Sequence, residues 1–266
     1  MLSERQQHCL RGIGVKLWRG RQRGDENRAQ PESVSAVPPV ETAIAPGIPA
    51  TSAPQTLAEK AAAQKAQQAS VETPPGANIE IPTLDSWDDI IGAIKACEAC
   101  ELSQNCTQKV PGVGDRKANL LIVGEGPGHD EDIRGEPFVG RSGQLLDRML
   151  AAIGIGREQV YITNIVKCRP PNNRDPKVDE AQHCRLYLDA QIKQIAPRVI
   201  LAVGRVSAHN LLGSNLPVGK LIKQMHQLPG TEIPLKVTYH PAYLLRNPSA
   251  KAIAWQDLKL LHQLLQ

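Results

Sequence analysis

Four short apolar runs divide the C-terminal two thirds of the chain. Three are almost continuously apolar, at residues 119–123 (NLLIV), 160–166 (VYITNIV) and 199–203 (VILAV), and a fourth at 235–239 (LKVTY) is more polar. Short apolar runs bounded by turn residues are typical of strands that are buried on both faces of a sheet. The pattern therefore predicts four central β-strands.

Apolar residues at helical spacing fill the segments around these runs. They predict five helices, at residues 86–96, 142–152, 178–195, 206–212 and 253–265. The first of these has Ser86 at its N-cap position and Asp88 and Asp89 in its first turn. Strands that alternate with helices imply right-handed βαβ units. We therefore predict an α/β fold, with a four-stranded parallel doubly wound sheet, helices on both faces and one extra N-terminal helix.

The predicted sheet brings several chemically distinctive residues to one edge. Ligands of such sheets bind beyond the carboxyl ends of the strands. The first strand runs into Gly124, the second carries Asn164 near its end, and the fourth ends at His240. We expect these three residues to converge on one cleft.

The N-terminal region has a different composition from the rest. The chain has 266 residues and only eight aromatic ones, none of which lies between Arg19 and Ser86, where prolines are frequent. A segment without large apolar groups cannot offset its ordering entropy by burial. We predict a short peptide at residues 1–24, a disordered linker at 25–80 and a folded domain at 81–266.

Neither membrane insertion nor secretion is indicated by the sequence. No apolar run approaches the roughly 18 residues that span a bilayer, and the N-terminus lacks the apolar core of a signal peptide. We expect a cytoplasmic protein that does not insert into a membrane. Its net charge of +4 is too small to indicate a polyanionic partner by itself.

The cysteines are candidate ligands. The chain has six of them: Cys9 in the N-terminal peptide, a C-x2-C pair at Cys97 and Cys100, and then Cys106, Cys168 and Cys184. In a cytosolic chain, cysteines are more often metal ligands or small buried hydrophobes than disulfides. Their spacing alone leaves both interpretations open.

The glycine-rich segment GEGPG at residues 124–128 follows the first strand and precedes an acidic run at 130–132. Its glycines allow the backbone to approach a ligand closely. It differs from the dinucleotide-binding pattern G-x-G-x-x-G, and its proline removes an amide that would bind phosphate. A nucleotide cofactor is therefore disfavoured.

Two further motifs suit the recognition of a flat base. Phe138, the only phenylalanine, lies between Pro137 and Val139-Gly140 just before a predicted helix, where it could plug the core or form a stacking platform. His240 precedes Pro241, which holds it outside the helical region. Beyond it, Leu244 and Leu245 beside Arg246 suit either a helical turn on the core or a wedge with a phosphate anchor.

Taken together, GEGPG, GEPFVGRSGQLLDRML, YITNIVKCRPPNNRDP and HPAYLLR resemble the family 4 uracil-DNA glycosylases, the iron-sulfur class of their superfamily. The resemblance runs from about Cys97 to the C-terminus. It implies a [4Fe-4S] cluster on Cys97, Cys100, Cys168 and Cys184, with four-cysteine zinc as the alternative and no counterpart for Cys106.

The resemblance also implies a uracil pocket. In it, Gly124, Glu125 and Gly126 line one wall, Phe138 stacks on the base, Asn164 reads its polar edge and His240 donates to a carbonyl oxygen. Leu244 and Leu245 would fill the stack that the flipped base leaves, and Arg246 would hold a phosphate. We expect His240, Glu125 and Asn164 to be catalytic, and Glu125 or the acidic run to position water, favour the sugar cation or exclude a thymine methyl.

The implied function is excision of uracil from single- or double-stranded DNA in base excision repair, by a monomeric hydrolase. The loop from Cys168 to Cys184 lacks the basic insertion of the branch that bonds covalently to uracil-DNA, which favours turnover. An alternative is a catalytically silent iron-sulfur accessory protein of the replication machinery, which the presence of both Asn164 and His240 disfavours. A redox protein is also disfavoured, since no second cysteine pair or dinucleotide fingerprint appears.

Residues 8–19 include the only apolar patch of the N-terminal region. The patch suits an Arg-rich leader or a tail without function. It also resembles the N-terminal peptide of the psi subunit of bacterial DNA polymerase III, which docks on the chi subunit. That resemblance implies a tether to the replication machinery, with the linker raising the effective concentration.

Overall fold

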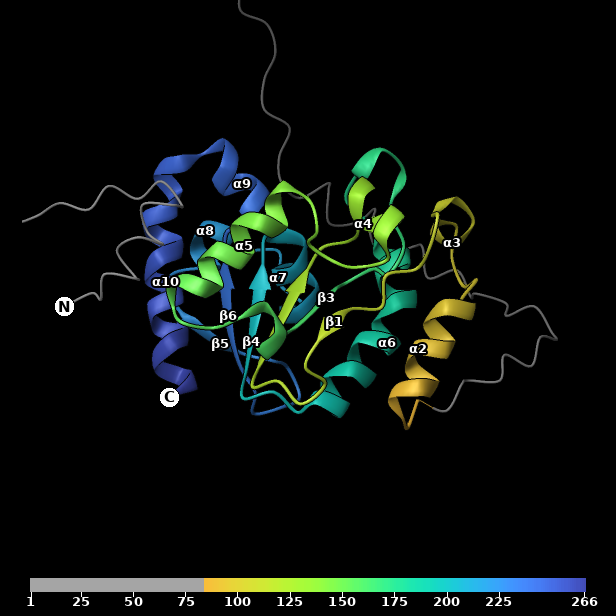
Figure 1. The fold of residues 1–266 in the computed structure, drawn as a ribbon, viewed down its shortest axis with the longest axis horizontal. Helices are drawn as coiled ribbons and strands as arrows, with labels where there is room; N and C mark the ends of the chain where they lie inside the picture. The colour runs from red at the N-terminus through yellow and green to blue at the C-terminus, as the bar shows by residue number, and fades with distance from the viewer. Residues whose placement is uncertain (1–83) are drawn as a thin grey trace, which may run out of the picture. The chain divides into compact units, whose positions relative to one another are not determined.

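A six-stranded mixed sheet forms the centre of the computed structural model, which describes residues 84–266 (Figure 1). The predicted linker and the peptide at residues 8–19 lie outside the described residues. The strand order is β1-β3-β2-β4-β6-β5. The strands are β1 (Val113–Gly114), β2 (Leu120–Gly124), β3 (Tyr161–Asn164), β4 (Val199–Val203), β5 (Met225–Gln227) and β6 (Pro234–Thr238).

The four predicted strands form the parallel centre of this sheet, β3-β2-β4-β6, and this part of the prediction is confirmed. The prediction of four strands is incomplete, because β1 pairs antiparallel with β3 and β5 pairs antiparallel with β6 at the two edges. Both edge strands are short and carry partly exposed side chains, so they lack an apolar run.

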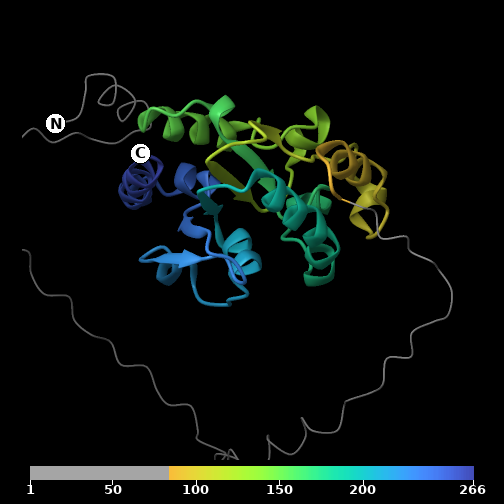
Figure 2. The same ribbon diagram turned by 90° about the horizontal axis from the view of Figure 1, so that it is seen from below.

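Helices cover both faces of the sheet. In β2, Leu120 and Ile122 pack with α5 (Arg141–Ala152) and α10 (Lys251–Leu265), whereas Leu121 and Val123 face the opposite core. That second core includes residues of α6 (Val178–Ile195), α7 (Arg205–Leu212) and α8 (Val218–Leu221). Figure 2 shows green α5 and light-blue α7 and α8 on opposite sides of the sheet. The doubly wound arrangement is confirmed.

The extra N-terminal helix, α2 (Trp87–Ala96), begins with a capping box at Ser86. The Ser86 hydroxyl accepts a hydrogen bond from the Asp89 N–H at 3.2 Å, and the Ser86 N–H donates to the Asp89 carboxylate at 3.1 Å. Ile90 and Ile94 pack against Tyr187 of α6. The helix therefore brings its C-cap residue, Cys97, to the side of α6.

Loops and short helices gather where the parallel strands end, at the upper edge of the sheet in Figure 1. They include α3 (Leu102–Asn105), α4 (His129–Arg134) and α9 (Pro241–Arg246), and the 3-10 turns η2 (Pro171–Asn173) and η3 (Pro248–Ala250). A further 3-10 turn, η1 (Arg157–Gln159), lies at the opposite edge, directly before β3. In the part of the chain that is described, no helix has the length and apolar character that crossing a membrane requires.

Candidate functional site

A cleft of about 470 Å³ opens at the carboxyl edge of the sheet. Its walls come from the loop after β2, the start of α5, the end of β3, the η2 loop and α9. The predicted site residues that line it are Glu125, Gly126, Phe138, Asn164, His240 and Arg246. The predicted convergence of three strand ends is confirmed, since Asn164 also pairs in register with Gly124.

Asn164 is the last residue of β3, and its side chain is only 2% exposed. Among the described residues, its Oδ1 is the one buried side-chain nitrogen or oxygen that has no hydrogen-bond partner. A buried unpaired carbonyl costs about 1–3 kcal/mol. The cleft therefore contains an acceptor that a ligand N–H would satisfy.

Phe138 is held beside this amide by unusual backbone geometry. It has a φ of 55°, in the left-handed region that a bulky residue seldom adopts. A Cβ on Gly143, in the first turn of α5, would collide with the Phe138 carbonyl, so glycine allows Phe138 to pack against this turn. A Cβ on Gly124 would meet the Phe138 ring at 2.7 Å and also the Asn164 Oδ1. Gly124 thus leaves the space in which ring and amide lie together.

His240 stacks on Phe138, with ring centroids 5.6 Å apart and planes at 29°. Its Nδ1 accepts a hydrogen bond from the Ala242 N–H at 3.1 Å and so caps α9. Burial first, and then the charge of Arg246, lower the pKa of His240 to about 4, against the opposing charge of Glu131. Near neutral pH the ring is therefore uncharged, and its proton resides on Nε2 as a donor.

Glu125 and Gly126 form the wall that follows β2. The Val166 N–H donates to the Glu125 carbonyl at 3.2 Å, and a Cβ on Gly126 would lie 2.8 Å from the Val166 side chain. Burial first, and then the charge and hydrogen bond of Asp175, raise the pKa of Glu125 to about 7, while Arg205 opposes the rise. This carboxyl therefore titrates near neutral pH.

Two members of the acidic run at residues 130–132, Glu131 and Asp132, bind backbone groups of neighbouring loops. Glu131 lines the cleft, but its carboxylate accepts hydrogen bonds from the backbone N–H groups of Gly128, Val139 and Gly140 at 3.0–3.1 Å. Asp132 accepts from the Thr107 N–H and hydroxyl, both at 2.8 Å. Because both carboxylates hold loops together, the expectation that the whole run serves the substrate is not supported for Asp132.

The two leucines of α9 have different environments. Leu244 is 1% exposed and packs in the core with α5 and α10, an environment that does not favour the expectation that it fills the vacated stack. Leu245 is 39% exposed, and Arg246 is exposed at the end of the same helix. Leu244 therefore packs on the core, as the interpretation of this segment as a helical turn predicts, whereas Leu245 and Arg246 are exposed to a partner.

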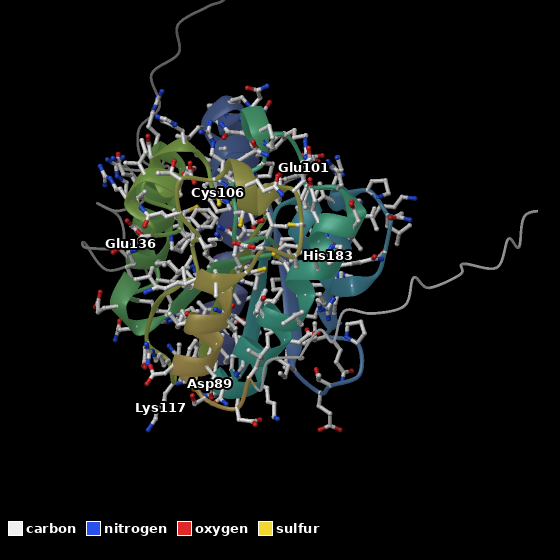
Figure 3. All side chains as sticks on the ribbon, turned by 90° about the vertical axis from the view of Figure 1, so that its right-hand side faces the viewer. Asp89, Glu101, Cys106, Lys117, Glu136 and His183 are labelled. Carbon is white, nitrogen blue, oxygen red and sulfur yellow. The ribbon has the colours of Figure 1, made fainter. Side chains whose placement is uncertain are left out.

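The described cysteines gather between the α2–α3 segment and α6. Cys168 and Cys184 are each 3% exposed in one core cluster, and Cys100 and Cys106 pack against that cluster. Cys97 lies against Ile94 and Tyr187. Figure 3 looks onto this side of the molecule, with sulfur in yellow and Cys106 labelled. All five thiols are free.

The donor set of these cysteines fits a thiolate-ligated group. Cys184 interacts electrostatically with Cys100 and Cys97, and Cys168 interacts with Cys106, Cys184 and Cys100. Buried thiols that face one another are typical ligands of zinc or iron-sulfur clusters. Within residues 84–266, however, no three His, Cys, Asp or Glu side chains have the arrangement of a closed metal site.

The charged residues Arg174, Asp175 and Arg205 lie near the cleft and were not predicted from the sequence as site residues. Arg174 forms an ion pair with Glu180 at 2.6 Å, in which the Glu180 side chain is 1% exposed. The next residue, Asp175, contacts both Glu125 and Arg205, the first residue of α7. Arg174 and Asp175 line the cleft. The available signal for Arg174 and Asp175 was their place in the loop between two candidate cysteine ligands, and Arg205 had no such signal.

These features define an α/β protein with a cleft beyond the carboxyl ends of its strands, lined by one aromatic ring and several polar groups. Residues 111–259 match the family described as the uracil DNA glycosylase superfamily. The chain is 43% identical to a type-4 uracil-DNA glycosylase of Archaeoglobus fulgidus, over 68% of this chain and 94% of that protein. It is 46% identical to a type-4 uracil-DNA glycosylase of Thermotoga maritima, over 62% of this chain and 88% of that protein.

A type-4 uracil-DNA glycosylase of Sulfurisphaera tokodaii is 41% identical, over 68% of this chain and 86% of that protein. The chain belongs to the uracil DNA glycosylase superfamily and, within it, to the type-4 group. The resemblance seen in the sequence motifs is confirmed.

Proposed function

We propose that this protein is a DNA repair glycosylase that hydrolyses the N-glycosidic bond of uracil flipped out of DNA. The observation that carries the proposal is the unpartnered Oδ1 of Asn164 in a cleft that also presents the neutral ring of His240. Its type-4 relatives support the same activity. A catalytically silent accessory protein has no need of either group in this arrangement.

Recognition of uracil follows from the chemistry of the asparagine amide. Its Oδ1 accepts a hydrogen bond from uracil N3–H, and its amide nitrogen donates to O4. Cytosine presents the reverse pattern at these positions and leaves the buried amide unpaired. Phe138 stacks on the base, and the wall of Gly124, Glu125 and Gly126 confines it.

Cleavage then separates charge. The glycosidic bond breaks with its electron pair on the base, so negative charge develops on uracil and positive charge on the deoxyribose. The His240 Nε2–H donates to the carbonyl oxygen of uracil on which negative charge grows. We assign to Glu125, as a carboxylate lining the cleft, the roles of favouring the sugar cation and orienting water. The water supplies a hydroxyl to the sugar and a proton to the base, leaving an abasic site and free uracil.

Surface residues of α9 suit the flipped conformation of DNA. The exposed Leu245 would occupy the gap that the base leaves in the stack, and Arg246 would pair with a phosphate. Leu244 is buried and is not assigned to this contact. Replacement of Leu245 by alanine should slow excision more from duplex than from single-stranded DNA, and equal slowing of both would contradict the wedge.

The experiment that tests the proposed activity uses a labelled oligonucleotide with a single uracil. After incubation with the full-length protein, alkali should cut the strand at the uracil position, because an abasic site is alkali-labile. Matched oligonucleotides with thymine or cytosine at that position should remain intact. An uncut uracil strand at excess protein would favour the accessory role.

The same proposal includes a [4Fe-4S] cluster held by Cys97, Cys100, Cys168 and Cys184. When bound, the cluster supplies rigid ligation that ties the Cys168–Cys184 loop to the α2–α3 segment. Because that loop carries Arg174 and Asp175 into the cleft, its order matters for the site. Four-cysteine zinc is the alternative occupant.

Metal analysis and absorbance distinguish these occupants. We expect iron and sulfide in the purified protein, with a broad absorbance shoulder at about 400 nm. Cys184→Ser should remove the shoulder, whereas Cys106→Ser should keep it, because Cys106 has no place in the proposed ligand set. Stoichiometric zinc without the shoulder would overturn the cluster, and loss of the shoulder in Cys106→Ser would overturn the ligand assignment.

We propose uracil-containing DNA as the partner, and a monomer in the bacterial cytoplasm as the working form. The chi subunit of DNA polymerase III is the proposed partner of residues 8–19, on the sequence resemblance alone. Deletion of residues 1–24 should abolish co-purification with chi while uracil excision continues. Unchanged co-purification after the deletion would exclude this contact.

A further inference from the structure

Asp175 joins the uracil cleft to two other parts of the molecule. Its carboxylate forms an ion pair with the Arg205 guanidinium at the start of α7. The same carboxyl is hydrogen-bonded to Glu125 in the loop after β2. Glu125 and Asp175 both line the cleft. Three segments that are distant in the sequence are therefore linked by one row of charged side chains, Glu125, Asp175 and Arg205.

A hydrogen bond between two carboxyl groups requires a proton between them. Neighbouring carboxylates repel each other, so Glu125 retains its proton to a higher pH than an isolated carboxyl does. Burial of the Glu125 carboxyl adds to the effect of Asp175, and the proton therefore resides on Glu125. The raised pKa of Glu125, about 7, agrees with this arrangement.

Other ionisable groups also line the cleft, and three of them bind partners outside the row. Glu131 of α4 is bound by backbone amides, and Arg174 pairs with Glu180. His240 caps α9, and Arg246 is exposed at the other end of that helix. The charged groups that act on the Glu125 carboxyl are therefore Asp175 and Arg205, and neither Glu131 nor Arg174 is among them.

We propose that Asp175 is a positioning residue: together with Arg205 it holds the Glu125 carboxyl in the uracil cleft and sets whether that group meets the substrate as an acid or as a carboxylate. The inference rests on the proposed glycosylase function. The carboxylate is the active form, because it favours the cationic sugar and orients water. Excision should therefore accelerate as the pH rises through the titration of Glu125.

The test compares two substitutions with opposite electrostatic effects. Asp175→Asn removes a negative neighbour, so the midpoint of the single-turnover pH profile should fall by about half to one pH unit. Arg205→Gln removes the positive neighbour and should raise the midpoint. The shifts are modest because the Asp175 and Arg205 side chains are more than half exposed. Glu125→Gln should abolish this limb of the profile.

Asp189→Asn is the matched control. Asp189 forms an exposed ion pair with Arg185 within α6, at 2.7 Å and outside the cleft, so its loss should leave the midpoint unchanged. If Asp175→Asn and Arg205→Gln slow excision equally at every pH, Asp175 is only a tie between loops and the proposal is wrong. Shifts of both variants in the same direction would also overturn it.

A measurement that needs no DNA separates this inference from the proposed function. The Glu125 carboxyl can be titrated by ¹³C NMR in the holoprotein, with the signal assigned by its absence in Glu125→Gln. If the titration midpoint of Glu125 falls in Asp175→Asn and rises in Arg205→Gln, the proposed role of Asp175 is supported even if the protein does not excise uracil. An unchanged Glu125 titration in both variants would overturn the proposed role of Asp175, even if uracil were excised.

Discussion

Replacement of His240 by alanine should slow uracil excision from single-stranded DNA by about 10²- to 10³-fold in single-turnover assays. The structure gives the reason in the hydrogen bond from the Ala242 N–H to Nδ1, which leaves the proton on Nε2. With its pKa lowered to about 4, the ring stays neutral across the working pH range and donates without carrying a charge. Alanine removes the donor to the departing base.

The same substitution removes the side-chain cap of α9, which is worth about 1 kcal/mol. A thermal melt of the variant is therefore needed to show that it is folded at the assay temperature. His183→Ala is the matched control, because His183 is exposed on α6 and its Nδ1 bonds only the Asp179 carbonyl, at 2.8 Å. Near-normal excision by a folded His240→Ala protein would remove His240 from the mechanism.

The parallel centre of the sheet was predictable because its strands are buried on both faces. All five residues of β2 and of β4 are buried, which requires continuous apolar runs. The edge strands had no such signal. Val113–Gly114 and Met225–Gln227 pair through backbone hydrogen bonds, and their side chains are partly exposed. Their pairing depends on a neighbouring strand that already exists, which no local pattern encodes.

The site was predictable where a motif lies at the end of a strand, as with Asn164 and His240. The row of Glu125, Asp175 and Arg205 was not, because its members approach one another only after three loops have folded. Leu244 is a different case, since its burial could have been predicted. Pro241 and Leu244 are three residues apart, share the buried face of α9 and are both buried. This spacing favours the interpretation of the segment as a helical turn on the core over that of a wedge at Leu244.

Replacement of Asn164 by alanine should reduce excision about 100-fold without a loss of stability. The two hydrogen bonds to uracil are each worth about 1.4 kcal/mol, and together they correspond to a factor of about 100 in rate. In the free protein, however, the Oδ1 of Asn164 is buried without a partner. Its removal relieves an unpaired polar group that costs about 1–3 kcal/mol, which offsets the small cavity that alanine leaves.

Gln191→Ala is the matched control for this prediction, because Gln191 is also a fully buried amide but has its partners in the protein. Its Nε2 donates to the Pro111 carbonyl at 2.8 Å, and its Oε1 accepts from the Lys167 ammonium at 2.8 Å. Loss of these bonds should lower the free energy of unfolding by about 2–4 kcal/mol in urea melts. A buried amide that serves the fold should thus be distinguishable from one that serves a ligand. Equal destabilisation by Asn164→Ala, with excision retained, would mean that Asn164 is structural.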